Sequence, residues 1–193
     1  MKIRIVSFYT ASKSPRLPPL AALFAVLALG GGCTTGDRSD QPPPQVVPQV
    51  DLNRYLGTWY EIASIPNAFQ RGCVATKATY SRREDGAIQV VNECRQGSLQ
   101  GEPRRAVGTA WVADANPAKL KVQFFWPFRG DYWIIELDQD YRYAVVGQPT
   151  REYLWILSRT PSMEPELYQE LLRRIAAQGY EPTEITRTLQ PPG

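Results

Sequence analysis

Few side chains in this chain could carry covalent or acid–base chemistry. Histidine is absent, which excludes Ser-His-Asp and Cys-His nucleophile pairs and removes both the commonest metal ligand and the usual general base. No glycine-rich phosphate-binding loop occurs, and Cys73 and Cys94 do not form a zinc site by themselves. We therefore expect no metal, no cofactor and no enzymatic activity.

Carboxylates are the remaining candidates for catalysis. Glu61, Glu93 and Glu136 lie in segments that read as strands. Lone strand carboxylates are more often solvated or ion-paired than catalytic. An enzyme acting on an apolar substrate would nevertheless need a titratable group of this kind, and Glu61 or Glu136 would supply it.

The N-terminal segment has the layout of an export signal. Residues 1–16 carry four basic side chains and no acidic one, and "LPPLAALFAVLAL" follows, before "GGGC". This apolar run would reach about 20 Å as a helix, short of a hydrocarbon core of roughly 30 Å. We predict a signal peptide over residues 1–32 rather than a spanning helix.

The cysteine at the end of this segment is a candidate for acylation. Small residues followed directly by Cys33 resemble the lipobox of bacterial lipoproteins, which implies that Cys33 becomes a mature N-terminus carrying acyl chains such as palmitate. Thr34, rather than an aspartate, comes next, and the resemblance then implies the outer membrane, with the domain in the periplasm. Ordinary cleavage after Gly30 is the alternative. Residues 33–50 are polar and rich in proline, as a tether would be.

Removing the leader changes both the net charge and the class of partner to be expected. The chain has 22 basic and 19 acidic side chains, and the leader takes four of the basic ones, so nothing favours nucleic acid. In an oxidising periplasm Cys73 and Cys94 are expected to form a disulfide, with two separate thiols as the alternative.

From Tyr55 onward, runs of β-forming residues recur every ten to fifteen positions with turn residues between them. Eight strands are predicted, at 58–64, 74–81, 87–93, 104–112, 119–126, 131–138, 142–147 and 153–159. Their short connections allow only antiparallel neighbours. A helix of about fourteen residues is predicted from Pro165 to just before Gly179, and a last short run, "TEITRTL", could add an edge strand. We therefore expect an all-β, eight-stranded antiparallel up-and-down barrel over residues 51–190, with one C-terminal flanking α-helix.

Alternation along each strand predicts which side chains face the barrel interior. The apolar loop after the first strand, which contains Phe69, reads as a lid over the open end. In the first strand, Glu61 and Ala63 share the inward parity of Trp59. The other expected inward residues are Thr76, Ala78, Tyr80, Ile88, Val90, Asn92, Leu120, Val122, Phe124, Trp126, Tyr153, Trp155 and Leu157.

Three segments carry a family resemblance. "LGTWYEIA" resembles the Gly-x-Trp motif of the lipocalins, "LWILSRTP" their C-terminal motif, and "GDYWIIELDQDYRYAVV" stands in the place of their middle motif. The lipobox together with these motifs resembles the bacterial lipocalins, in the subgroup that includes apolipoprotein D. The resemblance implies that Gly57, Trp59 and Arg159 close the barrel, with Arg159 against the indole, and it places Tyr132, Ile134, Ala144 and Val146 inside.

The resemblance also implies a function. We expect a lipid-anchored outer-membrane protein that holds a fatty acid or lysophospholipid in its barrel, for storage, transport or repair of membrane lipid. Arg129 and Arg71, in loops at the open end, are the expected head-group contacts. Two other classes stay open: a barrel enzyme, and an envelope lipoprotein that binds a protein partner without lipid. Homodimer formation also stays open.

Overall fold

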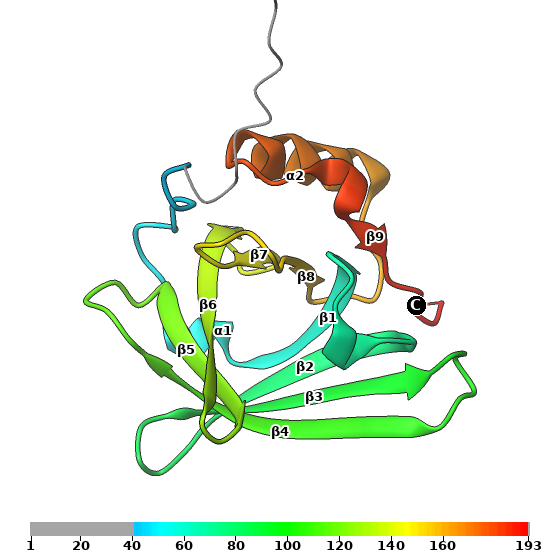
Figure 1. The fold of residues 1–193 in the computed structure, drawn as a ribbon, viewed down its shortest axis with the longest axis horizontal. Coiled ribbons are helices and arrows are strands. Elements are labelled where there is room, and N and C mark those ends of the chain that lie inside the picture. The colour runs from blue at the N-terminus through cyan, green and yellow to red at the C-terminus, as the bar shows by residue number, and fades with distance from the viewer. Residues whose placement is uncertain (1–40, 193) are drawn as a thin grey trace, which may run out of the picture. The chain divides into compact units, whose positions relative to one another are not determined.

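The computed structural model describes residues 41–192, and these form one antiparallel sheet closed into a barrel (Figure 1). Neighbouring strands follow the order β2-β3-β4-β5-β6-β7-β8-β1-β9, and a further pairing of β2 with β1 closes the ring. The strands are β1 (Gly57–Ser64), β2 (Cys73–Arg82), β3 (Ile88–Gln96), β4 (Pro103–Val112), β5 (Lys119–Phe125), β6 (Phe128–Leu137), β7 (Tyr143–Gly147), β8 (Trp155–Ser158) and β9 (Thr186–Arg187). The predicted eight-stranded up-and-down barrel is confirmed, with β9 as an added edge strand.

Within residues 41–192, four short helical segments accompany the barrel. α2 (Pro165–Ala177) begins and ends where the sequence predicts. The sequence analysis does not anticipate the others, α1 (Leu52–Tyr55), η2 (Ala68–Gln70) and η3 (Pro182–Glu184). In α1 the Asp51 side chain accepts hydrogen bonds from the backbone N–H groups of Asn53 and Arg54, which caps a helix of only four residues.

Two apolar cores lie on opposite faces of the barrel wall. One fills the interior and includes Trp59, Ile134 and Leu157. The other lies outside, where Leu171 and Ile175 of α2 pack on Ile156 and its neighbours in the sheet. Figure 1 shows α2 lying across β7 and β8. Because β7 carries buried side chains on both faces, its residues read as a continuous apolar run rather than an alternating one.

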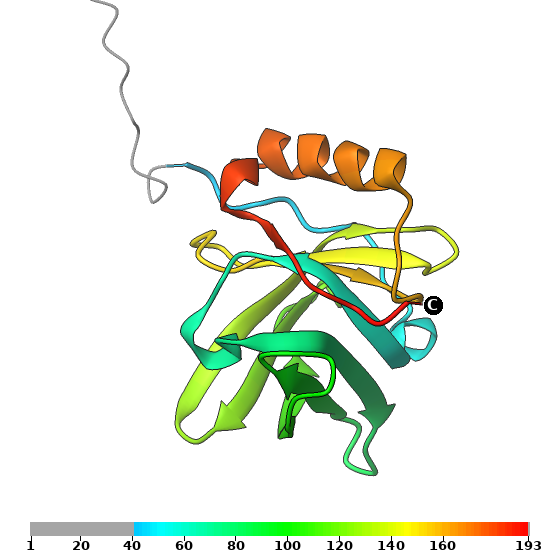
Figure 2. The same ribbon diagram turned by 90° about the vertical axis from the view of Figure 1, so that its right-hand side faces the viewer.

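The barrel has two distinct ends (Figure 2). The loops β1–β2, β5–β6 and β7–β8 lie at the left of that view, and α1 with the β2–β3 and β6–β7 turns lies at the right. We call the end with the β1–β2, β5–β6 and β7–β8 loops the open end, and the end with α1 the closed end. This arrangement agrees with the grouping of loops expected for an up-and-down barrel.

Residues 41–50 lie against the barrel, although the sequence assigns them to the tether. The Val47 N–H donates to the Ile134 carbonyl at 3.0 Å, Val50 is buried, and Arg151 Nη2 donates to the Pro42 carbonyl at 2.5 Å. The packed domain therefore begins before residue 51. The predicted signal peptide, Cys33 and the first part of the tether lie outside the described residues.

Candidate ligand-binding site

The closed end is held by Arg159 and Trp59. The guanidinium carbon of Arg159 lies 3.8 Å from the centroid of the Trp59 ring, which confirms the predicted contact. The same guanidinium donates to backbone carbonyls of four residues: Arg54, Tyr55, Thr58 and Tyr141. Trp59 is fully buried and its Nε1 donates to the Tyr55 carbonyl at 2.8 Å. Burial lowers the pKa of Arg159, but a guanidinium stays charged at neutral pH.

Gly57 is required at its position for two reasons. Its φ is +95°, a conformation that other residues rarely adopt, and a Cβ there would lie 3.2 Å from Arg159 Nη1. The space beside Gly57 is thus occupied by the guanidinium of Arg159.

Most of the predicted interior residues belong to a single apolar core. Tyr80, Val90, Ile134 and Ala144 are buried in it, and five others that pack on it are partly exposed: Ala78, Val122, Phe124, Tyr132 and Trp155. Trp59 and its neighbours close the bottom. The interior is thus apolar in its depth and reached by solvent at several positions along its wall.

Three tyrosines place hydroxyl groups inside this apolar interior. The Tyr132 hydroxyl lies 2.8 Å from that of Tyr55 and 2.9 Å from that of Tyr80. Burial raises the pKa of Tyr80 to about 12 and raises the pKa values of Tyr55 and Tyr132 well above their usual range. The cluster is therefore neutral at physiological pH, and its hydroxyl groups satisfy one another. Tyr55, which precedes the first strand, is not among the predicted interior residues.

The prediction that Ala63 faces the interior is wrong. The pairing of β1 with β8 shifts between Glu61, opposite Leu157, and Ala63, opposite Ile156. A bulge of one residue transfers the following side chains to the other face, so Ala63 packs in the outer core beneath α2. Ser64 takes the inward parity instead, opposite Trp155.

Trp126 is not inside the barrel either. Phe125 pairs with Phe128, so Trp126 and Pro127 form the turn between β5 and β6, and 84% of Trp126 is exposed. Alternation along β5 does not extend to Trp126, because the strand ends at Phe125.

Phe69 lies at the open end, as the loop assignment predicts. Its ring packs on Tyr153 and Trp155, with centroid distances of 5.4 and 6.4 Å. Trp155 Nε1 donates to Gln70 Oε1 at 2.8 Å, so η2 is attached to β8 across the open end.

Arg129 does not lie over the interior. It belongs to β6, and its guanidinium carbon is 5.4 Å from the centroid of the Trp111 ring. Trp111 pairs with Lys121, which lies opposite Asp131, on the outer face of the wall. Tyr132 faces inward and Arg129 lies three positions before it in β6. Because side chains alternate along a strand, Arg129 faces outward.

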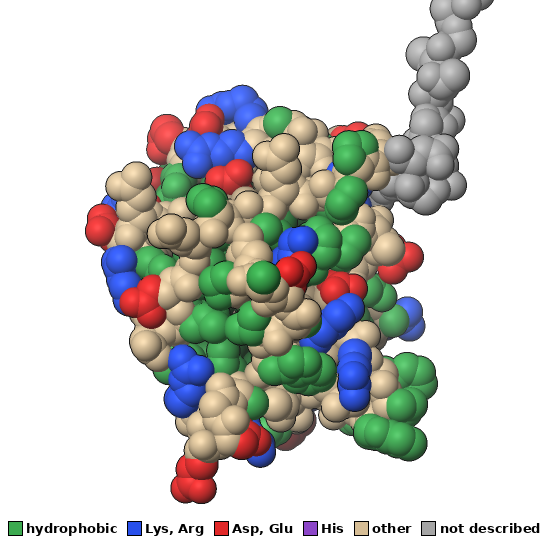
Figure 3. All heavy atoms as spheres, turned by 90° about the vertical axis from the view of Figure 1, so that its left-hand side faces the viewer, with side chains coloured by type: hydrophobic (Ala, Val, Ile, Leu, Met, Phe, Trp, Pro, Cys, Tyr) green, Lys and Arg blue, Asp and Glu red, His purple; other side chains and the backbone are tan. Residues whose placement is uncertain are grey.

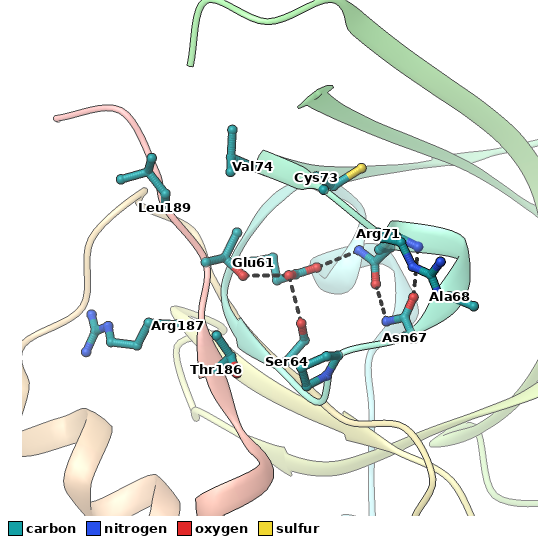
Figure 4. Close-up of a pocket in the computed structure, with 14 residues that line it drawn as sticks. Glu61, Ser64, Asn67, Ala68, Arg71, Cys73, Val74, Thr186, Arg187 and Leu189 are labelled. Carbon is teal, nitrogen blue, oxygen red and sulfur yellow. Dashed lines mark hydrogen bonds between the residues drawn. The ribbon is translucent and has the colours of Figure 1, made fainter. Parts of the chain in front are cut away.

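A pocket of about 530 Å³ opens in the wall at the open end (Figure 4), bounded by the β1–β2 loop, the start of β2 and residues 186–189. β1 and β2 pair only from Gly57–Tyr60. Beyond that point the C-terminal segment bridges them: Thr188 N–H donates to the Ile62 carbonyl, and Ala75 N–H donates to the Leu189 carbonyl. The pocket lies where the strands have separated.

Glu61 forms the polar floor of this pocket. Oε1 accepts from Ser64 Oγ at 3.0 Å and from Thr188 Oγ1 at 2.6 Å, and Oε2 accepts from Gln70 Nε2 at 2.8 Å. Only 5% of Glu61 is exposed. The inward parity of Glu61 is predicted from sequence, but its donors are not, because Gln70 and Thr188 come from irregular segments.

The two carboxylates considered for catalysis therefore have structural partners. Three donors hold Glu61, and Glu136 lies 3.5 Å from Arg174 of α2. Among residues 41–192, histidine, cysteine, aspartate and glutamate form no cluster that could hold a metal ion.

Arg71 lines the pocket and is exposed. Within the described residues its guanidinium has no hydrogen-bond or ion-pair partner. It is thus a cation available at the open end, as expected.

The cysteine pair lies beside the same pocket. Cys73 at the start of β2 and Cys94 in β3 form a disulfide with Cα atoms 5.5 Å apart, as predicted. The bond ties the β1–β2 loop to the neighbouring strand. No helix in the described part of the chain is both long and apolar enough to cross a membrane.

Comparison with solved structures supports the fold. Lobster apocrustacyanin A1 superimposes with a TM-score of 0.61 at 15% identity, over 78% of this chain and 91% of that one. Insecticyanin from the tobacco hornworm gives a TM-score of 0.60 at 19% identity, over 77% and 84% of the two chains.

Sequence relatives are closer. The outer membrane lipoprotein Blc of Escherichia coli K12 is 41% identical over 91% of this chain and 98% of its own length. Temperature-induced lipocalin-1 of Arabidopsis thaliana is 42% identical over 76% and 82%, and bovine apolipoprotein D is 34% identical over 90% and 93%. A lipocalin-like domain model matches residues 50–190. With a closed barrel, a Trp59–Arg159 contact at its closed end and these relatives, the chain belongs to the lipocalin family.

Proposed function

We propose that this protein is a carrier that holds the acyl chain of a fatty acid or lysophospholipid inside its barrel. The observation that carries the proposal is the composition of the interior. Its side chains are apolar, its polar atoms at the tyrosine cluster are satisfied by one another, and five of its residues are partly exposed. An acyl chain needs such a lining because it offers no hydrogen-bonding groups of its own.

The driving force is burial without reaction. Each methylene group removed from water contributes about 0.8 kcal/mol, so ten of them contribute roughly 8 kcal/mol before the costs of ordering are subtracted. The proposed contacts of the chain are Ala78, Tyr80, Val90, Val122, Phe124, Tyr132, Ile134, Ala144 and Trp155.

The head group would lie at the open end. Arg71 supports this placement because its guanidinium is exposed at the wall pocket and could donate to a carboxylate or phosphate. Phe69 would cover the upper part of the acyl chain from its position against Trp155.

The location proposed is the outer membrane, reached through an acylated Cys33. The lipobox-like sequence and a relative named as an outer membrane lipoprotein support it. The barrel would then take up, store or return membrane lipid from the periplasm.

Native mass spectrometry of the purified protein tests the carrier function. We expect an added mass equal to a fatty acid or lysophospholipid, and its loss in Ala78→Phe, which fills the interior. Val107→Phe, on the exposed side of β4, is the matched control and should retain the lipid. Absence of bound lipid in the parent protein, after incubation with both lipid classes, would contradict the proposal.

A further inference from the structure

The turn between β5 and β6 exposes three aromatic side chains. The exposed fractions are 73% for Phe125, 84% for Trp126 and 77% for Phe128. Phe125 and Phe128 pair across the turn, so the three rings project from one short tip. Single exposed apolar residues are ordinary, but a cluster of large ones marks an interaction surface.

This aromatic tip (Phe125, Trp126 and Phe128) projects at the open end. Figure 2 shows the β5–β6 turn at the same end as the β1–β2 loop, where Phe69 is 57% exposed. Figure 3 shows hydrophobic side chains protruding at the lower right of the opposite face, with Lys and Arg side chains beside them.

Arginines gather at the same end. None of them forms an ion pair within residues 41–192, although Glu93 lies opposite Arg105 in the β3–β4 register and Glu102 immediately precedes β4. Arg95 and Arg104 bond only to neutral oxygens, of Gly101 and Gln96. The open-end arginines are Arg71, Arg95, Arg104, Arg105 and Arg129.

The closed end is different, because several of its basic residues are ion-paired, while Arg54, Arg82 and Arg159 contact Tyr141, Asn53 and Trp59 instead. Arg83 pairs with Asp85 and Arg142 with Asp138. Lys119 and Asp114 pair in the β4–β5 region. The excess of positive charge and the exposed rings therefore coincide at one end only.

We propose that the open end docks on the surface of an anionic lipid bilayer. The aromatic tip enters the interface between head groups and acyl chains, where tryptophan and phenylalanine are stabilised. The open-end arginines contact anionic head groups. This contact is separate from the N-terminal anchor and from lipid carriage: it could form even if the interior held no ligand.

A second copy of the chain fits this surface less well. A symmetric dimer through the tip would place the open-end arginines of one copy near those of the other. Like charges brought together in this way oppose association, whereas an anionic bilayer complements them.

Brominated phospholipid tests the docking, because bromine quenches a tryptophan that enters the bilayer. The protein as purified from membranes, with its native N-terminus, is reconstituted into vesicles of mixed zwitterionic and anionic lipid. The emission of Trp126 is obtained as the difference between the parent and Trp126→Phe. We expect this emission to fall by about twofold or more when the lipid is brominated.

Two controls define the orientation. Glu84→Trp, made in the Trp126→Phe background, puts the reporter at the closed end and should show no quenching. Arg104→Gln combined with Arg105→Gln should weaken the docking equilibrium by about tenfold, as should omitting anionic lipid.

Each contrary result overturns the proposal. Equal or absent quenching at the two ends shows that the open end does not face the bilayer. Shielding of Trp126 from an aqueous quencher without vesicles, increasing with protein concentration, would identify a second copy as the occupant. Ala78→Phe, which is expected to lose the interior lipid, should still dock on vesicles as the parent does. The two proposals can therefore fail independently of each other.

Discussion

The guanidinium carbon of Arg159 lies 3.8 Å from the centroid of the Trp59 ring. The same group donates hydrogen bonds to the backbone carbonyls of Arg54, Tyr55, Thr58 and Tyr141. One side chain thus connects α1, β1 and the β6–β7 turn. The contact joins residues a hundred positions apart in sequence and closes the interior from below.

Replacing Trp59 by Ala should lower the free energy of unfolding by about 3–5 kcal/mol, because it removes a fully buried ring and leaves a cavity. Urea unfolding at neutral pH measures the loss. Arg159→Lys keeps the charge but cannot reach all four carbonyls, so a smaller loss of about 1–3 kcal/mol is expected. An unchanged midpoint in Trp59→Ala would contradict the closure.

Gly57→Ala should destabilise the protein by more than Gly86→Ala. Both glycines have positive φ, +95° and +81°, so an alanine is strained at either site by about 1–2 kcal/mol. Only at Gly57 would the new Cβ crowd Arg159, whereas at Gly86 nothing lies within 4 Å. Thermal unfolding of the pair separates crowding from backbone strain, and equal losses would argue against the crowding.

The tyrosine cluster should make the barrel sensitive to alkali. Since the pKa of Tyr80 is raised to about 12, the folded protein holds a proton that the unfolded chain releases above pH 10. The contribution of Tyr80 to the free energy of unfolding is therefore fully present below pH 10. It is lost as the pH rises through 12, by up to about 1.4 kcal/mol per pH unit.

Tyr80→Phe provides the test, because it removes this group and should flatten the decline. Urea unfolding of the parent and of Tyr80→Phe between pH 8 and pH 11.5 compares the two slopes. Tyr60→Phe is the control, because the Tyr60 hydroxyl has no hydrogen-bond partner within residues 41–192. Identical slopes in the parent and in Tyr80→Phe would show that the cluster is not the alkaline weak point.

Glu61→Gln should destabilise the fold by about 1–3 kcal/mol, since an amide cannot accept hydrogen bonds at both terminal atoms from Ser64, Gln70 and Thr188. Glu93→Gln is the matched control. Glu93 pairs with Lys77 on the surface, where a lost ion pair costs less than about 1 kcal/mol. Chemical unfolding measures the free energy of unfolding of both variants. Equal losses in the two would mean that the hydrogen bonds of Glu61 add no stability.

Reduction of the Cys73–Cys94 disulfide should cost about 2–4 kcal/mol, because the bond closes a loop with a sequence separation of 21 in the unfolded chain. The double replacement by Ser measures this without reductant. Unfolding curves that coincide with those of the oxidised parent would refute the estimate.

Strand number and the helix could be predicted because they depend on local patterns, whereas the contact between Trp59 and Arg159 is implied by the family resemblance. Gly57, Trp59 and Arg159 stand at element boundaries that turn residues mark. Alternation also places Tyr80, Val90 and Val122 correctly, since the pairing is regular from Lys77 to Arg82 in β2 and from Lys119 to Val122 in β5.

The errors arise where geometry departs from alternation. A bulge after Glu61 moves Ala63 to the outer face, and no residue type in "YEIAS" announces it. β5 ends at Phe125, whereas the apolar run in the sequence continues to Trp126, which lies in the turn. Arg129 is misplaced because the predicted loop is in fact strand, and the docking of residues 41–50 depends on partners such as Arg151, far along the chain.

The bridge between β1 and β2 sets the order in which the barrel can be completed during synthesis. Glu61 and Thr188 are separated by 127 positions, and β1 also needs β8 as a neighbour. Until those segments have been made, β1 has an unpaired edge that could join another chain, and closing so long a loop slows folding. The emerging polypeptide would therefore need protection from aggregation over most of its length.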